Sequence, residues 1–359
     1  MARERNKMRR RGQRDLSAAI QEWRYEVGID EHGARLDKFL AQRIRWRSRR
    51  GIQDLIAEEG AVEILPGKDP QQATIGALRD SLKLRTGQEV VVRQPNPQPE
   101  QPEIIGADPG ELEVVYEDEY LLAVNKPPHI SVHPSRGHLT GSLIHLIHER
   151  HRALYGDTQD MPTLCHRLDR ETSGVLLTAK DQVSRTRLGK QFESRSIDKT
   201  YLALVVGEIE GESGVMDQPL GKALGSEVRL KMGVREDGEG LPSKTEWKVA
   251  RRLPGHTLVQ LHPLTGRQHQ LRVHLAALGH PILGDKLYLG DEQIFIRSVS
   301  EEGLTQADRD FLVLDRQALH NWKLVVDHPF TGERLELVAP LFQDIADHAD
   351  ALAADSAGA

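Results

Sequence analysis

The 359-residue sequence predicts an α+β fold, in which a mixed, largely antiparallel sheet forms a large domain and a small α/β domain precedes it. Two observations support this prediction. Many strand-like apolar segments follow residue 104, and helical patterns fall irregularly between them, unlike the regular alternation of a βαβ fold. Residues 94–103 hold four prolines in ten positions, which is typical of a semi-rigid linker between two domains.

The chain divides into five predicted segments. Residues 1–16 are basic, show no apolar periodicity and are expected to be a disordered tail. Residues 17–93 are expected to form the small domain, residues 94–103 the linker and residues 104–345 the large domain. Residues 346–359 are rich in Ala and Asp and are expected to be a frayed tail.

The small domain is predicted to contain two helices and two strands. Between Arg35 and Glu59 the i, i+3, i+4 spacing of a helix occurs twice, with a break near Ser48, at Leu36, Phe39, Leu40 and then at Ile52, Leu55, Ile56. Strands are predicted at Ala61–Leu65 and Glu89–Arg93, the second entered through the Thr86–Gly87 turn.

The large domain is predicted to contain eight strands with three helices between them. Apolar segments predict strands at Leu112–Tyr116, Tyr120–Asn125, Gly174–Ala179, Tyr201–Val206, Thr245–Ala250, Thr257–Leu261, Trp322–Val326 and Leu335–Val338. Helical spacing predicts helices at Leu143–His151, Val183–Phe192 and Arg267–Leu278.

Composition excludes several classes of protein. The single cysteine, Cys165, rules out a disulfide framework and a cysteine-based zinc site, and no window approaches the ~20 apolar residues of a membrane helix. A soluble, cytoplasmic protein is therefore expected. The net charge of −6 divides into +8 over residues 1–50 and −14 over the rest, which fits an N-terminal end that binds a polyanion or, equally, a solvated charged tail.

Common cofactor and hydrolase motifs are absent. His145, His148 and His151 suggest a metal site, but HLIHERH lacks the HExxH spacing, and a polar helix face is the expected interpretation. There is no GxGxxG, no GxxxxGK[ST] and no GxSxG in the chain.

Asp169 lies in the informative segment CHRLDRETSGVLLTA, between Arg167 and Arg170 and just ahead of an apolar strand. Two neighbouring cations favour the ionised carboxylate and hold its pKa low. Such a carboxylate can be a nucleophile or an electrostatic anchor. From local physics alone, an ordinary turn aspartate with surface ion pairs remains the favoured alternative.

A second segment, HPLTGRQHQLRVHLAALGHPILGD, contains a predicted capping box. Thr265 with Gln268 three residues later predicts a helix that begins near Gly266. Arg267 would then lie in the first helical turn, on the same face as Leu271. Because the helix dipole disfavours a cation there, Arg267 is expected to pair with an acid from elsewhere in the fold.

Two further segments complete the pattern. The alternating strand DKTYLALVVG carries Tyr201 near its start, where an aromatic side chain more often fills a core than a site. The segment NKPPHISVHP is expected to be a loop, because its adjacent prolines end the strand before them.

Together these segments closely resemble the RluA-type pseudouridine synthases. The matching stretches occur in the family's order over most of residues 110–340, and they are NKPPHISVHP, HRLDRETSGVLLTAK, DKTYLALV, GRQHQLRVHLAALGHPILGD and RQALHNWKLVVDHPFTGE. Residues 35–93 resemble the S4-like RNA-binding domain that precedes the catalytic domain in many members. The chain departs from the family at Pro128–His129–Ile130 and in an extra segment at 291–313.

The resemblance implies a role for each matching residue. Asp169 corresponds to the catalytic aspartate, Arg267 to the basic residue that salt-bridges it, and Tyr201 to the tyrosine that packs on uracil. Leu271 corresponds to the apolar residue on the other side of the pocket, and Arg167 to the arginine that fills the space of the flipped nucleotide. His166 and Arg170, in the same motif, are expected to contribute to substrate binding.

The implied function is isomerisation of uridine to pseudouridine in structured RNA, by base flipping and without a cofactor or metal. Large-subunit ribosomal RNA is the expected target, with transfer RNA as the alternative. The expected partners are RNA only, with no membrane, and the chain is expected to be a monomer. A non-catalytic RNA-binding or ribosome-assembly factor on the same fold is the alternative from a different class.

Overall fold

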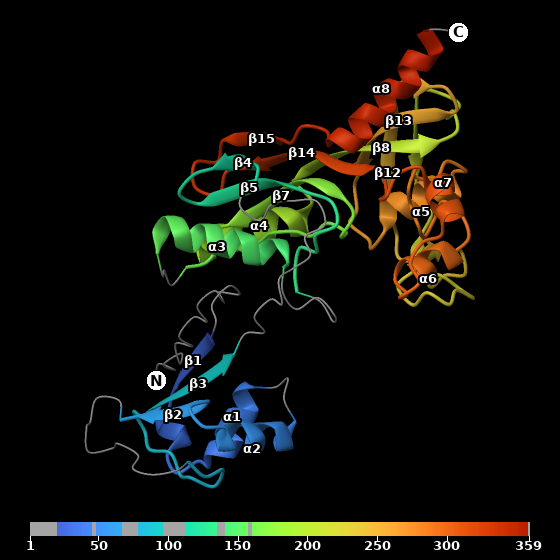
Figure 1. The fold of residues 1–359 in the computed structure, drawn as a ribbon. Helices are drawn as coiled ribbons and strands as arrows, with labels where there is room; N and C mark the ends of the chain where they lie inside the picture. Colours follow the sequence, from blue (N-terminus) through green and yellow to red (C-terminus); the bar gives the residue numbers. More distant parts are fainter. Residues whose placement is uncertain are drawn as a thin grey trace. The chain divides into compact units, whose positions relative to one another are not determined.

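The computed structural model describes residues 20–44, 48–66, 78–95, 112–134, 141–156 and 160–357. These form two compact units, one within residues 14–100 and one within residues 101–359, and each is described by itself (Figure 1). The predicted tail 1–16 and most of the predicted linker lie outside the described residues. No described helix is both long enough and apolar enough to cross a bilayer.

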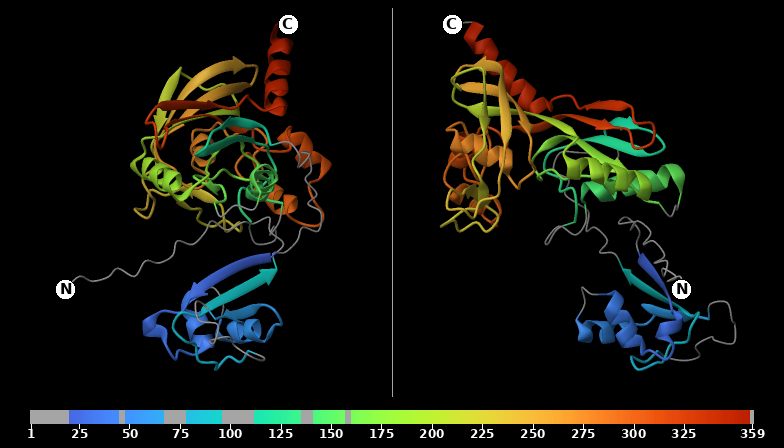
Figure 2. Two further views of the ribbon diagram at one scale, coloured as in Figure 1. Left: turned by 90° about the vertical axis from the view of Figure 1, so that its left-hand side faces the viewer. Right: turned by 180° about the vertical axis from the view of Figure 1, so that it is seen from behind.

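The smaller unit is a three-stranded antiparallel sheet with two helices, as Figures 1 and 2 show. The strand order is β1-β3-β2, from β1 (Ile20–Glu26), β3 (Glu89–Pro95) and β2 (Val62–Leu65). The predicted helices are confirmed as α1 (Leu36–Arg43) and α2 (Arg49–Ala57), and a 3-10 turn, η1 (Ile29–Glu31), precedes them. All six periodic apolar residues are buried in one core.

Strand β1 was not predicted from the sequence. Its sequence, IQEWRYE, alternates large and charged residues, and only Trp23 and Tyr25 pack against the core of the small unit. Its pairing partner is β3, whose residues lie 63 to 75 positions further along the chain and pair with β1 from Ile20 to Glu26. The strand is therefore stabilised by a long-range ladder rather than by a strong local apolar pattern.

The larger unit contains a ten-stranded sheet, and the predicted mixed, largely antiparallel α+β fold is confirmed. The main strand order is β4-β5-β7-β14-β8-β13-β12-β9, with β15 beside β14 and β6 beside β7. The strands are β4 (Val114–Glu117), β5 (Leu121–Lys126), β6 (Thr163–Leu164), β7 (Ser173–Ala179), β8 (Asp198–Val206), β9 (Ser213–Met216), β12 (Thr245–Leu253), β13 (His256–Pro263), β14 (Leu319–Asp327) and β15 (Arg334–Val338). A separate hairpin joins β10 (Leu220–Lys222) to β11 (Met232–Val234).

The pairing of β7 with β14 is parallel, while the other pairs of named strands in the described part of the chain are antiparallel. It brings Ser173 opposite His320 and Gly174 opposite Asn321. Gly174 has φ 110°, and a Cβ atom there would overlap the backbone of Asn321. The glycine of the HRLDRETSG segment is therefore needed for a close approach of two strands, directly after the predicted site residues.

Helices cover the two ends of this sheet. Figure 1 shows α3 (Leu143–Tyr155) and α4 (Gln182–Ser194) along the β5–β7 end. At the other end, α5 (Gln270–Ala277) packs on β11 and β13, and α6 (Gln293–Ser298) and α7 (Gln306–Leu312) lie near it. The extra segment 291–313 thus forms α6 and α7.

The predicted frayed tail at 346–359 is wrong, because helix α8 (Gln343–Ala357) occupies most of it. Ile345 and Ala349 are buried in the main core, and Leu352 and Ala353 pack against the same cluster. The helix has one apolar face, but much of that face is alanine and the segment is rich in aspartate, so its sequence did not indicate a buried helix. Figure 2 shows α8 running past the β8–β13–β12 part of the sheet, and contacts with β12 confirm this position.

Candidate active site

Asp169 lies in the loop between β6 and β7, at the first position of a turn. The Thr172 amide donates to the Asp169 carbonyl at 3.2 Å, which is the i to i+3 bond of a β-turn. The Asp169 side chain is 30% exposed, so its carboxylate is partly buried yet accessible from one side. The turn therefore presents the carboxylate at the mouth of the β7–β14 pair.

Arg272, in the first turn of α5, holds this carboxylate. Its Nη1 lies 3.2 Å from Asp169 Oδ2. Its Nε and Nη2 donate to Asp285 Oδ2 and Oδ1, at 2.6 and 2.8 Å. Asp285 is fully buried, so this two-pronged pair fixes the guanidinium plane and leaves one N–H edge for Asp169.

The electrostatics favour an ionised Asp169. Burial alone would raise the pKa of Asp169, but the charge and hydrogen bond of Arg272, with a hydrogen bond from Gln317, outweigh burial and lower it. Arg272 itself has a raised pKa, because the charge and hydrogen bonds of Asp285 overcome its desolvation. Asp169 is therefore a carboxylate at neutral pH.

The prediction that Arg267 forms this salt bridge is wrong. Helix α5 begins at Gln270, not near Gly266, and Arg267 precedes it. The Gln270 side chain, rather than Gln268, accepts from the Arg267 amide at 3.0 Å and from Thr265 Oγ1 at 2.7 Å. The Arg267 guanidinium Nε instead donates to the Pro242 carbonyl at 3.2 Å.

A signal for Arg272 was present in the sequence. The helix buries Leu271, Val273 and Leu275 on different faces, so a charged residue among them requires a buried partner. Asp285, in the ILGD turn that follows, is that partner. The physical reasoning that an arginine in the first helical turn needs an acid was sound, but it applied to Arg272.

Tyr201 and Leu271, the residues predicted to line the uracil pocket, both belong to the core region of the larger unit. Leu271 belongs to the main core cluster, and Tyr201 of β8 packs against that cluster. Burial raises the pKa of Tyr201, and the charge of Asp169 raises it further, so the two side chains are close enough to interact. A neutral aromatic ring therefore lies within electrostatic range of the carboxylate.

Arg167 and Arg170 project from the same loop toward the surface. Arg167 is exposed, and its charge contributes to lowering the pKa of His133, after the larger effect of burial, which places it beside the 127–134 loop. Arg170 is exposed, and its Nε donates to the His129 carbonyl at 3.1 Å. Both cations are therefore exposed and adjoin the 127–134 loop.

His166 does not face the surface, so its predicted role in substrate binding is wrong. Its Nε2 accepts from the Leu177 amide at 3.0 Å, and its ring stacks on Phe192 at 5.3 Å between centroids. Burial, together with the charge of Lys199, lowers the pKa of His166 to about 3. This histidine is a neutral structural residue that closes the loop onto β7.

Lys126, at the end of β5, ties the neighbouring loop to the Asp169 turn. It is fully buried, and its Nζ donates to the carbonyls of Pro127, Ile130 and Arg170 at 2.7, 3.0 and 2.9 Å. Burial lowers the pKa of Lys126 well below its ordinary value. The lysine of NKPPHISVHP therefore uses all three donors to fix two loops, a role the sequence did not reveal.

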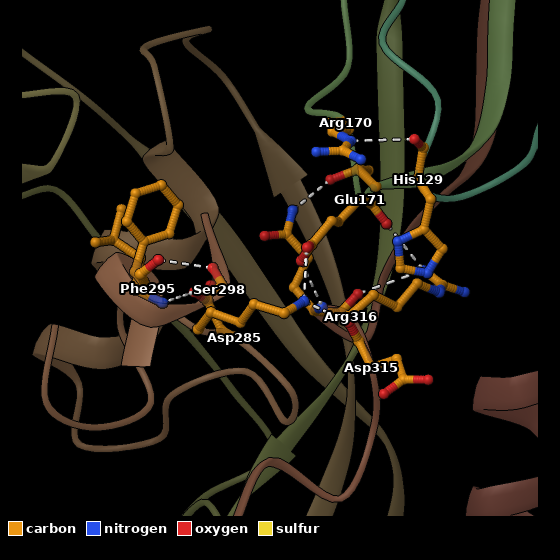
Figure 3. A network of polar contacts seen from close by, with 12 residues as sticks. His129, Arg170, Glu171, Asp285, Phe295, Ser298, Asp315 and Arg316 are labelled. Carbon is orange, nitrogen blue, oxygen red and sulfur yellow. Dashed lines mark hydrogen bonds and ion pairs between the residues drawn. The ribbon is translucent and has the colours of Figure 1, made fainter. Parts of the chain in front are cut away.

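A second polar network, centred on Glu171, also supports the turn (Figure 3). Lys286 Nζ donates to Glu171 Oε1 at 2.6 Å and also bonds the Asp315 carbonyl. Arg316 is fully buried, donates to the Glu171 carbonyl at 3.2 Å, and makes a two-pronged pair with Asp344 of α8 at 2.6 and 2.7 Å. The turn is thus braced by α8 as well as by α5.

No group of three or more His, Cys, Asp or Glu placed to hold a metal ion occurs in the described part of the chain. His145 and His148, from the predicted histidine face, lie on α3. His148 is buried with its Nε2 at 2.8 Å from the Pro162 carbonyl, and His145 Nδ1 lies 2.7 Å from Ser142 Oγ.

Comparison with known proteins agrees with this geometry. Residues 120–277 match the family model described as RNA pseudouridylate synthase. RNA pseudouridine synthase YlyB of Bacillus subtilis is 33% identical over 320 residues, covering 89% of this chain and 94% of that protein. Ribosomal large subunit pseudouridine synthase D of Pseudomonas aeruginosa is 35% identical, covering 89% of this chain and 92% of that protein.

A solved structure of a pseudouridylate synthase domain is also similar to this chain. The human RNA pseudouridylate synthase domain containing 4 aligns with a TM-score of 0.54 and 27% identity, over 67% of this chain and 93% of that chain. The matched regions include the Asp169 turn, Tyr201 and the start of α5. This chain therefore belongs to the RNA pseudouridine synthase family and is an RNA pseudouridine synthase.

Proposed function

We propose that Asp169 is the catalytic group of this enzyme and acts on a uridine flipped out of its RNA. The observation that supports this most directly is a partly exposed carboxylate, kept ionised by Arg272, with the Tyr201 ring within electrostatic range of it. Flipping a base costs a few kcal/mol, and a cation entering the vacated space offsets part of that cost. Arg167, exposed beside Asp169, is the side chain proposed for this role.

The proposed reaction needs no external reagent. The bond from the ribose C1′ to N1 of uracil breaks, the ring turns, and a bond from C1′ to C5 forms. The hydrogen on C5 leaves as a proton and N1 gains one, so the product is an isomer. Ionised Asp169 can start this either by attacking C1′ or by removing the 2′ proton, and both routes require the same charge state.

Large-subunit ribosomal RNA is the proposed substrate. The relative from Pseudomonas aeruginosa and one from Vibrio parahaemolyticus, 38% identical over 68% of this chain, are both called ribosomal large subunit pseudouridine synthase D. Transfer RNA is the second candidate. Unmodified transcripts of each class, compared as substrates, distinguish the two.

Replacement of Asp169 by Asn should abolish the release of tritium from RNA labelled at C5 of uracil. The amide cannot carry the charge that either route needs, so a loss of at least about 10³-fold in rate is expected. The matched control is Asp217→Asn, at an exposed aspartate of the same unit, which should keep the wild-type rate. Release by Asp169→Asn near the wild-type rate would refute the proposal.

The same assay in EDTA tests the absence of a metal requirement. Full release by the wild-type enzyme in EDTA supports catalysis by the side chains alone. Loss of release on chelation would contradict the cofactor-free mechanism.

The small unit is proposed to bind RNA phosphates through α1 and α2. Within the described part of this unit, Lys38, Arg49 and Arg50 are exposed and form no ion pair, whereas Arg35 and Arg43 are paired with Asp37 and Glu31. The charges of Arg49 and Arg50 at the N-terminal end of α2 are unfavourable for the helix dipole. The acid that Arg49 influences, Asp37, is already paired with Arg35, which suggests that the two arginines bind an external anion.

Arg49→Ala with Arg50→Ala should weaken RNA binding and flatten its salt dependence. Each phosphate contact contributes about 0.7–0.9 to the slope of log Kobs against log salt, so the loss of two contacts should reduce the slope by about 1.4–1.8. The control is Arg24→Ala with Arg93→Ala, because Glu22 already pairs with both side chains. An unchanged slope in the first pair would argue against this binding surface.

A further inference from the structure

A chain of polar contacts leads from the β10–β11 hairpin to Asp169. The Met232 amide, at the start of β11, donates to the Tyr288 hydroxyl oxygen at 2.9 Å. That hydroxyl lies 2.8 Å from His269 Nδ1. The other ring nitrogen, Nε2, lies 4.0 Å from Asp169 Oδ2. Neither His269 nor Tyr288 has a place in the mechanism described so far.

The contacts determine where the His269 proton lies. Because the Met232 amide already donates to the Tyr288 oxygen, the Tyr288 hydroxyl hydrogen can point at His269 Nδ1, which then accepts. The single ring proton is then on Nε2, facing the Asp169 carboxylate. The opposite tautomer would aim a nitrogen lone pair at an anion, which is electrostatically unfavourable.

The surroundings keep this ring neutral and fixed in place. Burial and the charge of Arg272 lower the pKa of His269 to about 4, despite the opposing effects of Asp169 and Asp285. The His269 side chain is 8% exposed, and its backbone has φ 55°, in the left-handed region. A non-glycine residue in this conformation at a buried polar site is typical of a functional constraint.

We propose that His269 is a positioning residue for Asp169, with its tautomer set by Tyr288. The neutral ring presents Nε2–H to Oδ2, the oxygen that Arg272 also contacts, which leaves Oδ1 to act on the ribose. At 4.0 Å the contact is longer than a hydrogen bond, and such contacts in unliganded sites commonly tighten with substrate. This inference rests on the proposed catalytic role of Asp169.

A four-variant cycle tests the tautomer directly. Tyr288→Phe keeps the ring that faces Arg272, at 4.9 Å, but loses the hydroxyl that sets the His269 proton. His269→Gln keeps an N–H donor near the Nε2 position and has no tautomers. Single-turnover release of tritium is measured for the wild type, both single variants and the double variant, with RNA affinity and thermal melting measured for each.

The inference predicts strong coupling between the two sites. In the wild-type background, Tyr288→Phe should lower the single-turnover rate on the order of 10-fold, with RNA affinity within twofold. In the His269→Gln background the same change should cost less than about twofold, because no tautomer remains to be set. Loss of the Met232 contact is common to both backgrounds and cancels in the cycle.

Equal losses in the two backgrounds would overturn the inference, since they would mean that Tyr288 only anchors the hairpin. A further measurement separates this outcome from failure of the proposed function. If Asp169→Asn stays active, both proposals fail. If Asp169→Asn is inactive while the cycle shows no coupling, Asp169 remains the catalytic residue and His269 has no positioning role.

Discussion

Replacement of Arg272 by Met should abolish pseudouridine formation, whereas Arg267→Met should leave the rate within about threefold of wild type. Arg272 is the guanidinium that contacts Asp169, and a fixed charge at such a position contributes on the order of 10²–10³ in rate. The Arg267 guanidinium instead donates to the Pro242 carbonyl, at 3.2 Å. Both variants replace an arginine by a methionine, at positions five residues apart, so they differ only in the site that is changed. Tritium release under single-turnover conditions measures both, and an inactive Arg267→Met would contradict the structure.

Arg272→Met also removes the partner of a fully buried carboxylate, Asp285. Leaving one charge of a buried pair uncompensated costs about 3–5 kcal/mol, so loss of activity in that variant could reflect unfolding. Arg272→Lys is the variant that separates the two effects. It keeps a cation beside Asp285, but an ammonium group cannot make the two-pronged pair and also contact Asp169.

The pH dependence of Arg272→Lys carries additional information. In the wild type, Arg272 outweighs the burial that would raise the pKa of Asp169, so the carboxylate stays ionised and the rate should be flat from about pH 8 down to about pH 5. In Arg272→Lys the contact that lowers the pKa of Asp169 is weakened while the effect of burial remains, so this pKa should rise. Activity should then be lost at a higher pH as the solution is acidified. Superimposable profiles would show that Arg272 does not control this ionisation.

The sequence contained enough information for most of the sheet but not for every partner in the site. Strand β7 is buried along its whole length, and β13 alternates between more and less buried residues. Both patterns are visible in the strand's own sequence, so both strands could be predicted. Asp169 and Tyr201 were identified through motif resemblance, and the structure places them together. Strand β1 and helix α8 were missed because their apolar content is sparse and only the tertiary partner makes them stable.

The site residues that were wrong or missed share a physical cause. Thr265 was predicted to form a capping box with Gln268, but its hydroxyl bonds Gln270. The helix starts at Gln270, four residues after the predicted start near Gly266, so Arg267 precedes the helix. His166 is a polar residue in a charged segment and was therefore expected at the surface, yet its ring accepts a hydrogen bond from the Leu177 amide of β7. Tyr288 accepts a hydrogen bond from the Met232 amide, 56 residues earlier in the chain. Lys126 donates to backbone carbonyls, including that of Arg170. Neither kind of contact produces a pattern in the neighbouring sequence.

The turn that supports Arg272 depends on a glycine. Gly284 precedes Asp285 and Lys286, has φ 75°, and lies so close to the Arg316 carbonyl that a Cβ atom would overlap it. Gly284→Ala should therefore destabilise the larger unit by about 2–5 kcal/mol, the sum of a left-handed alanine and an overpacked contact. Thermal unfolding of the purified protein measures this loss.

Gly255→Ala is the control, because it separates backbone strain from the overlap. Gly255 has φ 64° in the turn between β12 and β13, and a Cβ there meets no atom within 4 Å. Its substitution should cost only the left-handed strain, about 1–2 kcal/mol, and leave the rate unchanged.

Gly284→Ala should also lower the rate of the folded protein, on the order of 10-fold or more, because Asp285 orients Arg272 and Lys286 orients Glu171, two residues that hold the Asp169 turn. The two variants share a residue type and a sign of φ, so any difference in rate follows from the contact with Arg316. Equal stability and equal rates for the two alanine variants would mean that the Asp285 turn can move without moving the carboxylate. The bracing of Asp169 through Arg272 would then not require a rigid turn.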